Sequence, residues 1–469
     1  MKFKHGIGLF FGTIVTLAIA ACGGGAGGGP SDPVAVSPAP SAPTITLALS
    51  QSKISLGSTS TLTWSSTNAT SCSASGAWVG TQTVSGTSAQ TPASSGTTTY
   101  TLTCTGAGGT SYQSVALTVP IPVQKSSYEN KIVAATSLGP QTIASGDAVA
   151  FADFFQDGTY SMITHTLIYN SQDPTSANKL GSIHFWKKIN GVWTDNTASL
   201  LADTTGCLHP RKAIVADFNG DGAPDVFFAC HGFDAQPFLG EKQHILLSQH
   251  DGTYKNNTLP IVCFCHGASA ADVNGDGYPD IAVVDQFVAR TPNFLINNKD
   301  GTFKQDLTRL PTSLMDRQIY SAELIDFDKS GKFDLWLAGN EPNATKFPVS
   351  PLYTQLPTIY KNDGAGSYIS KTPVILPGDT QNGVALDINY INGNIYLLRT
   401  SIYDADTTYN TTAIQKISYP SLASSTIYTH SGPYQKNGNA NLSGWVNWII
   451  PYQGNIMSLN AMYDVSVPQ

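Results

Sequence analysis

The feature that most constrains this 469-residue chain is a short aspartate-rich pattern that recurs in its C-terminal part. Each copy has an apolar stretch, a polar turn with Asp at alternating positions, and a second apolar stretch. The three clearest copies begin at Asp217, Asp272 and Asp326, which are 55 and 54 positions apart. Such a regular period predicts a repeat architecture in which every unit has the same fold.

Weaker copies flank these three. One begins at Asp153, where Phe155 and Ser161 replace two oxygen-bearing positions of the pattern. Another begins at Asp387, where Ile391 stands in place of an acidic residue, and a last echo covers residues 454–464. These departures argue against a metal ion at the outer copies.

Each unit is expected to contain four strands, because an Asp-Gly hairpin signal follows the Asp217 copy at residues 250–254 and the Asp272 copy at residues 299–303. Four strands repeated at intervals of 54 to 64 residues predict the blades of a β-propeller. Residues 131–136 are predicted to be a further strand, which completes the last blade. This count gives six blades, with seven as the alternative.

The central copies resemble the FG-GAP/VCBS repeat family, whose Ca²⁺-binding propellers also form integrin heads. The resemblance covers residues 121–469 and implies an all-β propeller with calcium in its loops. The spacing also matches the first nine positions of an EF-hand loop, which offers oxygens to Ca²⁺ from alternating positions around a glycine. Three structural Ca²⁺ ions are therefore expected. The predicted ligands are Asp217, Asn219, Asp221, the Ala223 carbonyl and Asp225; Asp272, Asn274, Asp276, the Tyr278 carbonyl and Asp280; and Asp326, Asp328, Ser330, the Lys332 carbonyl and Asp334.

Composition agrees with an all-β chain and excludes one class of partner. Of the 32 acidic residues 28 are Asp, which favours turns, whereas Glu favours helix interiors. Only 12% of residues are charged, against about 25% in an average soluble protein. The net charge of −7 argues against a generally basic nucleic-acid binder.

The N-terminus is predicted to be an export signal. Lys2 and Lys4 precede an uncharged, mostly apolar stretch that ends at Cys22. The end of this stretch resembles a bacterial lipobox, which implies that residues 1–22 are a signal peptide and that Cys22 carries a lipid; an ordinary secretory signal is the alternative. Residues 23–43 are rich in Gly, Pro and Ser and are expected to form a disordered tether. The resemblance implies an outer-membrane lipoprotein on the periplasmic or exposed side.

Residues 44–120 are predicted to form a small β-sandwich. Lys53 is their one charged residue, and apolar residues alternate with Thr and Ser in several short runs. Cys72 and Cys104, with Trp64 nearby, resemble the core of immunoglobulin-like domains. We expect this domain to be a spacer.

The remaining cysteines lie among histidines that the strand order places on the propeller face opposite the calcium loops. Six cysteines remain after Cys22, and an exported protein is expected to pair them in three disulfides. Their pairing is open, although a Cys263–Cys265 bridge would close a very small, strained ring. The four on this face are Cys207, Cys230, Cys263 and Cys265.

Three interpretations of this face remain: two disulfides between neighbouring blades, a zinc site of Cys and His ligands, and a site for an anionic or sugar ligand. The disulfide and ligand interpretations are compatible with one another. His165 occupies the corresponding position in the first blade. The ligand-site candidates are His209, Arg211, His231, His266 and Asp285.

Two functions follow from this organisation. The first is a non-enzymatic calcium-binding surface lipoprotein whose propeller binds a protein or a glycan. The second is a carbohydrate-active enzyme, a polysaccharide lyase or hydrolase, on the same scaffold. The sequence shows no pair of carboxylates apart from the metal loops that would act as general acid and base, so no catalytic residue is assigned.

Overall fold

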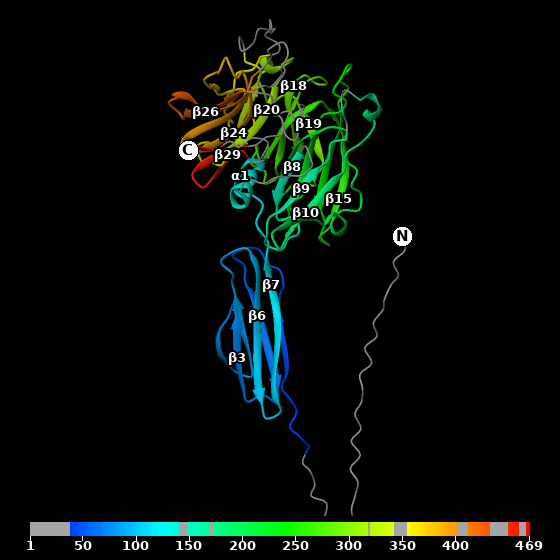
Figure 1. Cartoon of the computed structure of the whole chain (residues 1–469), viewed down its shortest axis with the longest axis vertical. Helices are drawn as coiled ribbons and strands as arrows, with labels where there is room; N and C mark the ends of the chain where they lie inside the picture. Colours follow the sequence, from blue (N-terminus) through cyan, green and yellow to red (C-terminus); the bar gives the residue numbers. More distant parts are fainter. Residues whose placement is uncertain are drawn as a thin grey trace, which may run out of the picture.

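A computed structural model describes residues 38–139, 148–168, 170, 173–317, 319–341, 354–401, 411–431, 449–458 and 466–469. Residues 1–37, including the predicted signal peptide and Cys22, lie outside this part of the chain. The described residues form two β-rich bodies joined end to end (Figure 1). None of their helices is long and apolar enough to cross a membrane.

The smaller body consists of two sheets that share one core. Alternating residues of its strands point inward, and Leu62, Leu102 and Leu117 are fully buried between the sheets. The first sheet contains β1 (Thr44–Leu49), β2 (Ser60–Thr67) and β5 (Ser85–Gln90). The second contains β4 (Gly80–Gln82), β3 (Ser71–Gly76), β6 (Gly96–Gly106) and β7 (Gly109–Val119).

The sandwich disulfide differs from that of an immunoglobulin domain. Cys72 on β3 is bonded to Cys104 on β6, and these two residues are direct cross-strand neighbours in one sheet. The disulfide of antibody domains instead connects the two sheets. Here Trp64 of the first sheet fills the core against Trp78, with the ring centroids 5.0 Å apart.

The larger body contains a series of antiparallel sheets, and in the described residues five have four strands and one has three. The first two sheets contain β8 (Ala148–Ala152), β9 (Ser161–His165), β10 (Ile183–Ile189) and β11 (Val192–Asp195); and β12 (Pro210–Ala216), β13 (Asp225–Cys230), β14 (Glu241–Ser248) and β15 (Tyr254–Cys263). The third and fourth contain β16 (Cys265–Ala271), β17 (Asp280–Asp285), β18 (Thr291–Asn297) and β19 (Phe303–Asp306); and β20 (Ile319–Ile325), β21 (Asp334–Gly339), β22 (Thr358–Tyr360) and β23 (Val374–Ile375). The last two contain β24 (Val384–Ile391), β25 (Asn394–Thr400), β26 (Thr411–Ser418) and β27 (Ser424–Ser431); and β28 (Ile449–Tyr452), β29 (Asn455–Ser458) and β30 (Ser466–Pro468).

These sheets are arranged as in a propeller. The first strand of each sheet packs against the first strand of the next, from β8 through β12, β16, β20 and β24 to β28. The first two strands of the central sheets are buried along nearly their whole length. A strand covered on both faces needs a continuous apolar run, and the stretches that flank the Asp motifs have this composition. Three short 3-10 helices lie between strands: η1 (Pro174–Ser176), η2 (Thr197–Ser199) and η3 (Thr312–Leu314).

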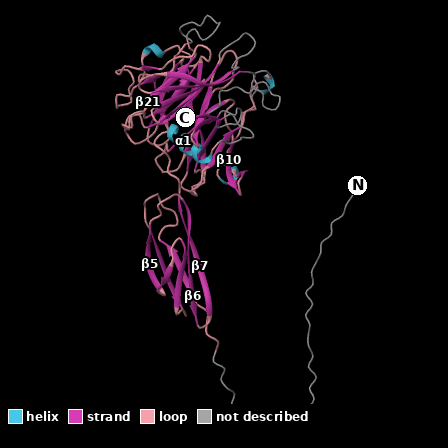
Figure 2. Ribbon diagram, turned by 60° about the vertical axis from the view of Figure 1, so that its left-hand side comes forward, coloured by secondary structure: helices cyan, strands magenta, loops and turns pink. Residues whose placement is uncertain are grey.

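The prediction of a strand at residues 131–136 is wrong. These residues belong to helix α1 (Ser127–Leu138), the one α-helix of the described chain, which Figure 2 shows among the strands of the larger body. The Ser126 side chain accepts a hydrogen bond from the Glu129 amide, so a Ser–x–x–Glu capping box begins the helix. Gly139, at a φ of 75°, ends it. The last sheet therefore has no strand from this segment among its described residues.

Helix α1 contacts the first strand of all six sheets. The Ser127 hydroxyl accepts a hydrogen bond from the backbone amide of Ala270 on β16. The side-chain amide of Asn130 donates to the Phe151 carbonyl of β8. Its other contacts reach β12, β20, β24 and β28. A buried helix in this position fills the space that the first strands surround.

Candidate functional site

The three predicted calcium loops occupy equivalent places, each between the first and second strand of its sheet: β12–β13, β16–β17 and β20–β21. In the first of them, one oxygen of Asp217 accepts hydrogen bonds from the amides of Gly220 and Asp221, and the other accepts one from Gly222. Gly222 has a φ of 85°, which a residue with a side chain rarely adopts. Asp272 accepts the same three hydrogen bonds from the amides of its own loop, and Asp326 accepts two of them, from the Ser330 and Gly331 amides.

The last Asp of each loop is buried at the start of the second strand. Burial raises the pKa of Asp225 to about 7 and that of Asp280 to about 6. Oδ1 of Asp280 accepts a hydrogen bond from the Asn297 amide, but Oδ2 is buried and has no hydrogen-bond partner among the described residues. A buried carboxylate oxygen without a partner is unfavourable unless a cation binds it. The donor set at Asp280 therefore fits a calcium ion.

Two other copies contain a lysine that supplies positive charge. The ammonium group of Lys361 pairs with Asp334 of the β20–β21 loop, and Lys187 pairs with Asp157 of the degenerate first loop. Asp153 of that first loop accepts a hydrogen bond from the Ile121 amide of the linker, at 2.9 Å. This degenerate copy helps to attach the linker to the larger body.

The degenerate copy at Asp387 is not a loop. Asp387 lies within β24, where it is 4% exposed, and a two-residue turn at Asn392 and Gly393 connects β24 to β25. The carboxylate forms an ion pair with Lys131 of α1 at 2.7 Å. Asp387 therefore stabilises the interior rather than a metal-binding turn.

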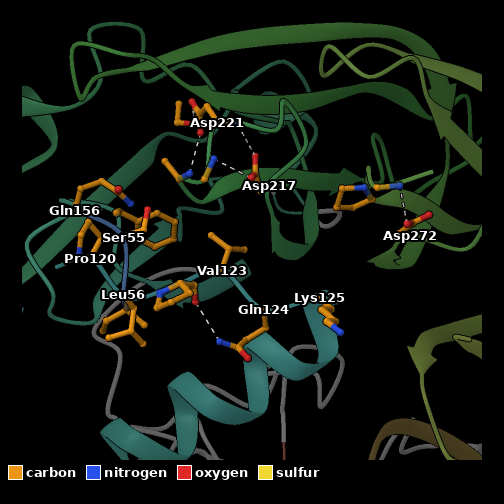
Figure 3. Close-up of a pocket in the computed structure, with 18 of the residues that line it drawn as sticks. Ser55, Leu56, Pro120, Val123, Gln124, Lys125, Gln156, Asp217, Asp221 and Asp272 are labelled. Carbon is orange, nitrogen blue, oxygen red and sulfur yellow. Dashed lines mark hydrogen bonds between the residues drawn. The ribbon is translucent and has the colours of Figure 1, made fainter. Parts of the chain in front are cut away.

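A large cavity lies where the sandwich meets the face that carries the predicted calcium loops. Its volume is about 980 Å³. Figure 3 shows Asp217, Asp221 and Asp272 on one side and Gln124 and Lys125 of the linker on the other. Residues 51–58 of the sandwich complete the wall. That the sandwich covers this face could not be predicted from the sequence, because no motif connects the two bodies.

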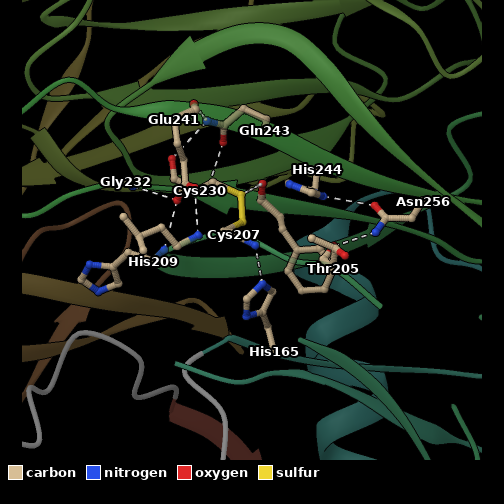
Figure 4. The surroundings of a disulfide bond; sticks show 12 residues. His165, Thr205, Cys207, His209, Cys230, Gly232, Glu241, Gln243, His244 and Asn256 are labelled. Atoms are coloured by element: carbon tan, nitrogen blue, oxygen red, sulfur yellow. Dashed lines mark hydrogen bonds between the residues drawn. A yellow bond between two sulfur atoms is a disulfide. The ribbon is translucent and has the colours of Figure 1, made fainter. Parts of the chain in front are cut away.

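On the opposite face the structure answers the question of disulfide pairing. Cys207, in the loop before β12, is bonded to Cys230 at the end of β13, and Cys263 at the end of β15 is bonded to Cys265 at the start of β16 in the next sheet. Together with Cys72–Cys104 this gives the three expected disulfides, and it leaves none of the six thiols to bind zinc. Figure 4 shows the Cys207–Cys230 bridge, with His165 below it beside the Cys207 amide and His209 further along the Cys207 segment.

The structure brings three of the five ligand-site candidates into one cluster. The rings of His209 and His231 are 4.8 Å apart, and Nε2 of His231 lies 2.9 Å from Nε2 of His266. Arg211 is close to the cluster, and its guanidinium is 3.6 Å from the carboxylate of Asp234. His209 and His231 are 7% and 0% exposed, so this cluster is not an open binding surface.

Asp285, another of the ligand-site candidates, takes part in a turn. Its carboxylate is buried and accepts hydrogen bonds from four backbone amides, those of Phe264, Phe287, Val288 and Ala289. These hydrogen bonds hold the turn that follows β17. Glu241 has the same role beside the histidines, where it accepts from the amides of Leu208, His209 and Gly232.

Two residues of this region carry no sequence motif. Asp234 lies in the β13–β14 connection, three positions after His231, and Glu241 begins β14. One cue in the sequence is the rarity of Glu, since the chain has four and Glu241, Glu323 and Glu341 all make buried contacts in the larger body. Asp234 had no comparable cue.

Comparisons with known proteins agree with the repeat. The FG-GAP-like repeat family matches residues 272–337, which span the second and third calcium loops. No curated protein matches the chain. One solved structure, a quinoprotein alcohol dehydrogenase-like protein from Bacteroides thetaiotaomicron, aligns over 81% of this chain and 93% of its own, at 9% identity and a TM-score of 0.26. So distant a likeness says nothing about function.

Proposed function

We propose that the chain is a non-enzymatic, calcium-binding surface lipoprotein. In this proposal an N-terminal lipid at Cys22 anchors it to the outer membrane, residues 23–43 form a tether and an immunoglobulin-like domain acts as a spacer. The larger body is a six-bladed propeller that binds an extracellular or periplasmic partner. The order of export signal, polar tether, sandwich and repeat sheets supports this arrangement.

Calcium is proposed to stabilise the propeller from the three Asp loops. The orphan oxygen of Asp280 favours a bound cation in the β16–β17 loop. The equivalent Asp225 of the β12–β13 loop is also buried, but both of its oxygens already accept hydrogen bonds, from the Phe218 and Asn219 amides and from Ser248. Both carboxyl groups would lose their raised pKa beside Ca²⁺, because a nearby cation favours the charged form. In the β20–β21 loop a calcium ion has to compete with Lys361 for Asp334.

The single observation that carries the binding function is the cavity between the sandwich and the calcium-loop face. At about 980 Å³ it has the size of a ligand site, and it is lined by amide, hydroxyl, amine and carboxylate groups together with apolar side chains such as Ile54, Leu56 and Val123. A hollow with this mixed lining suits a sugar, which has hydroxyl groups and apolar ring faces, better than the broad surface of a protein. We therefore favour a glycan over a protein as the partner.

A panel of bacterial and host polysaccharides tests this proposal. The chain from residue 23 onward, without Cys22, is assayed by calorimetry for binding and by a reducing-end assay for product release, with Ca²⁺ present. We expect at least one glycan to bind without being cleaved. Cleavage would support the carbohydrate-active enzyme instead, and binding of proteins alone would contradict the glycan proposal.

Variants of the cavity wall locate the site. Lys53 of the sandwich and Gln124 of the linker both line the cavity and come from different elements. The double variant Lys53→Ala, Gln124→Ala should weaken glycan binding by at least about ten-fold, which corresponds to about 1.4 kcal/mol. Lys304→Ala, at an exposed position on β19 outside the cavity lining, is the matched control. Unchanged binding in the double variant would exclude this cavity as the site.

A further inference from the structure

The histidine cluster on the face opposite the cavity has the geometry of a metal site. One potential ligand atom from each of His209, His231 and Asp234 lies within 4.8 Å of the other two. Ligand atoms at about 2.0–2.2 Å from one tetrahedral zinc ion lie roughly 3.4 Å apart, so small side-chain movements would bring these three atoms onto one ion. Two of these residues are buried imidazoles, and the third is a carboxylate that is 38% exposed.

His231 has one nitrogen committed to a protein contact and one that is not. Its Nε2 is 2.9 Å from Nε2 of His266, so in the neutral pair one ring donates and the other accepts. Its Nδ1 is buried and makes no hydrogen bond of ordinary geometry, and the Gly232 backbone lies beside the ring. If Nε2–H donates to His266, the lone pair is on Nδ1. A second histidine that fixes the ring and tautomer of a ligand is a usual feature of metal centres.

The disulfides hold the ligand-bearing segments together. His209 follows Cys207 by two residues and His231 follows Cys230 by one, so the Cys207–Cys230 bridge fixes both histidines. The His231 amide also donates to the His209 carbonyl at 2.8 Å. This explains why cysteines and histidines alternate in this stretch of sequence. The cysteines brace the site, and the imidazoles remain usable in an oxidising compartment.

We propose that His209, His231 and Asp234 bind a divalent first-row transition metal ion of the zinc class, with His266 orienting His231. Two imidazoles and one carboxylate match the donor sets of zinc and iron centres, whereas Ca²⁺ prefers oxygen ligands alone. Three protein ligands leave at least one coordination position open. The exposed side of Asp234 gives that position access to solvent.

Arg211 would compete with the metal ion for the Asp234 carboxylate. Its guanidinium lies 3.6 Å from the Asp234 carboxylate, where it provides the positive charge that a bound metal would provide. Metal binding therefore has to draw Asp234 away from Arg211. This competition lowers the affinity for the metal ion, but Asp234 can still serve as a ligand.

The test is a zinc titration of the chain from residue 23 onward, stripped with EDTA and then saturated with Ca²⁺ so that the Asp loops are occupied. Calorimetry should show one further equivalent of Zn²⁺, and Co²⁺ at the same site should give a visible d–d absorption band. His231→Gln should abolish this binding. Asp234→Asn, at a partly exposed position where folding is preserved, should weaken it by at least about ten-fold.

Matched controls lie on the same sheets. His244→Gln replaces a half-buried histidine of β14 that contacts Asn256, and Asp203→Asn replaces an exposed aspartate. Both should bind Zn²⁺ as the unaltered chain does. The proposal is overturned if no Zn²⁺ binds beside saturating Ca²⁺, or if Asp234→Asn, shown by its melting curve to be folded, binds as tightly as the Asp203→Asn control.

Discussion

Lys131 of helix α1 and Asp387 of strand β24 form a 2.7 Å ion pair although they are 256 residues apart in the sequence. Both side chains are at most 5% exposed. The same ammonium group lies 3.3 Å from Glu323 of β20, which also pairs with Lys212 of β12. Burial disfavours the charge, but the two carboxylates raise the pKa of Lys131 above its ordinary value. One network thus connects α1 to three sheets.

Lys131→Met should destabilise the larger body by about 3–5 kcal/mol, the usual cost of leaving a buried charge without its partner. The methionine keeps most of the volume, so the loss reports the charge. Urea unfolding measures it, and Lys255→Met, an exposed lysine of β15, is the control. Adding Asp387→Asn to Lys131→Met should recover part of the loss. An effect no larger than that of the control would show that the pair contributes nothing.

Stability should fall as the pH drops from 6.5 toward 4 because of His165. Its Nδ1 lies 2.8 Å from the Thr166 carbonyl, which can only accept, so Nδ1 carries the hydrogen. Nε2 then accepts from the Cys207 amide at 2.7 Å and cannot be protonated without losing that bond. Burial lowers the pKa of His165 from 6.5 to about 4. Between these values the unfolded chain binds a proton that the folded chain does not, so acid favours unfolding by up to about 3 kcal/mol.

The measurement for His165 is the free energy of unfolding in urea at pH 7 and at pH 4.5, for the unaltered chain and for His165→Gln. The other buried histidines are present in both proteins, so the difference isolates His165. The variant should lose less stability on acidification. Equal losses in the two proteins would refute this assignment.

Chelation of calcium should lower the melting temperature of the larger body. A ligand present at 1,000 times its Kd stabilises the folded state by about 4 kcal/mol for each site. Calorimetric scans in excess Ca²⁺ and in EDTA measure the shift, and Asp280→Asn should bind one ion fewer. Asp300→Asn is the control, since Asp300 lies in a hairpin and accepts from Thr302. Coincident scans in Ca²⁺ and EDTA would rule out the calcium sites.

Lys361→Met should raise the calcium affinity of the β20–β21 loop. The ammonium group of Lys361 pairs with Asp334, so a calcium ion must displace it from that carboxylate. Removing this competitor is worth about 1.4 kcal/mol if affinity rises ten-fold. A calcium titration that resolves the weakest site measures it. No change in that site would mean that Lys361 and calcium do not compete for Asp334.

The repeat was predictable because its chemistry is local. Asp217, Asp272 and Asp326 each begin a turn whose glycine and alternating oxygens can be recognised without knowledge of the fold. Helix α1 was missed because residues 131–136 are apolar enough to be a buried strand. Ser126 and Glu129 have the spacing of a capping box, but the helix is buried by strands that come much later in the chain.

The second face was predictable only in part. Strand order was sufficient to expect that His209, His231 and His266 would approach one another, because the connections involved end at the same edge. It could not show which cysteines pair, since this depends on the path of each connection. Asp285 has a side chain that could bind a ligand, but the turn after β17 also directs backbone amides to its oxygens, and a single sequence does not show this.

The position of α1 also has a consequence for biogenesis. The helix precedes every sheet that surrounds it in the order of synthesis, and its lysine lacks a counter-charge until β20 and β24 have been made. We therefore expect the C-terminal body to assemble in one step, once nearly the whole polypeptide has been synthesised. The preceding sandwich has its own core and ends at Val119. It can fold first, while the segment that follows it stays unfolded and open to proteases until the chain is complete.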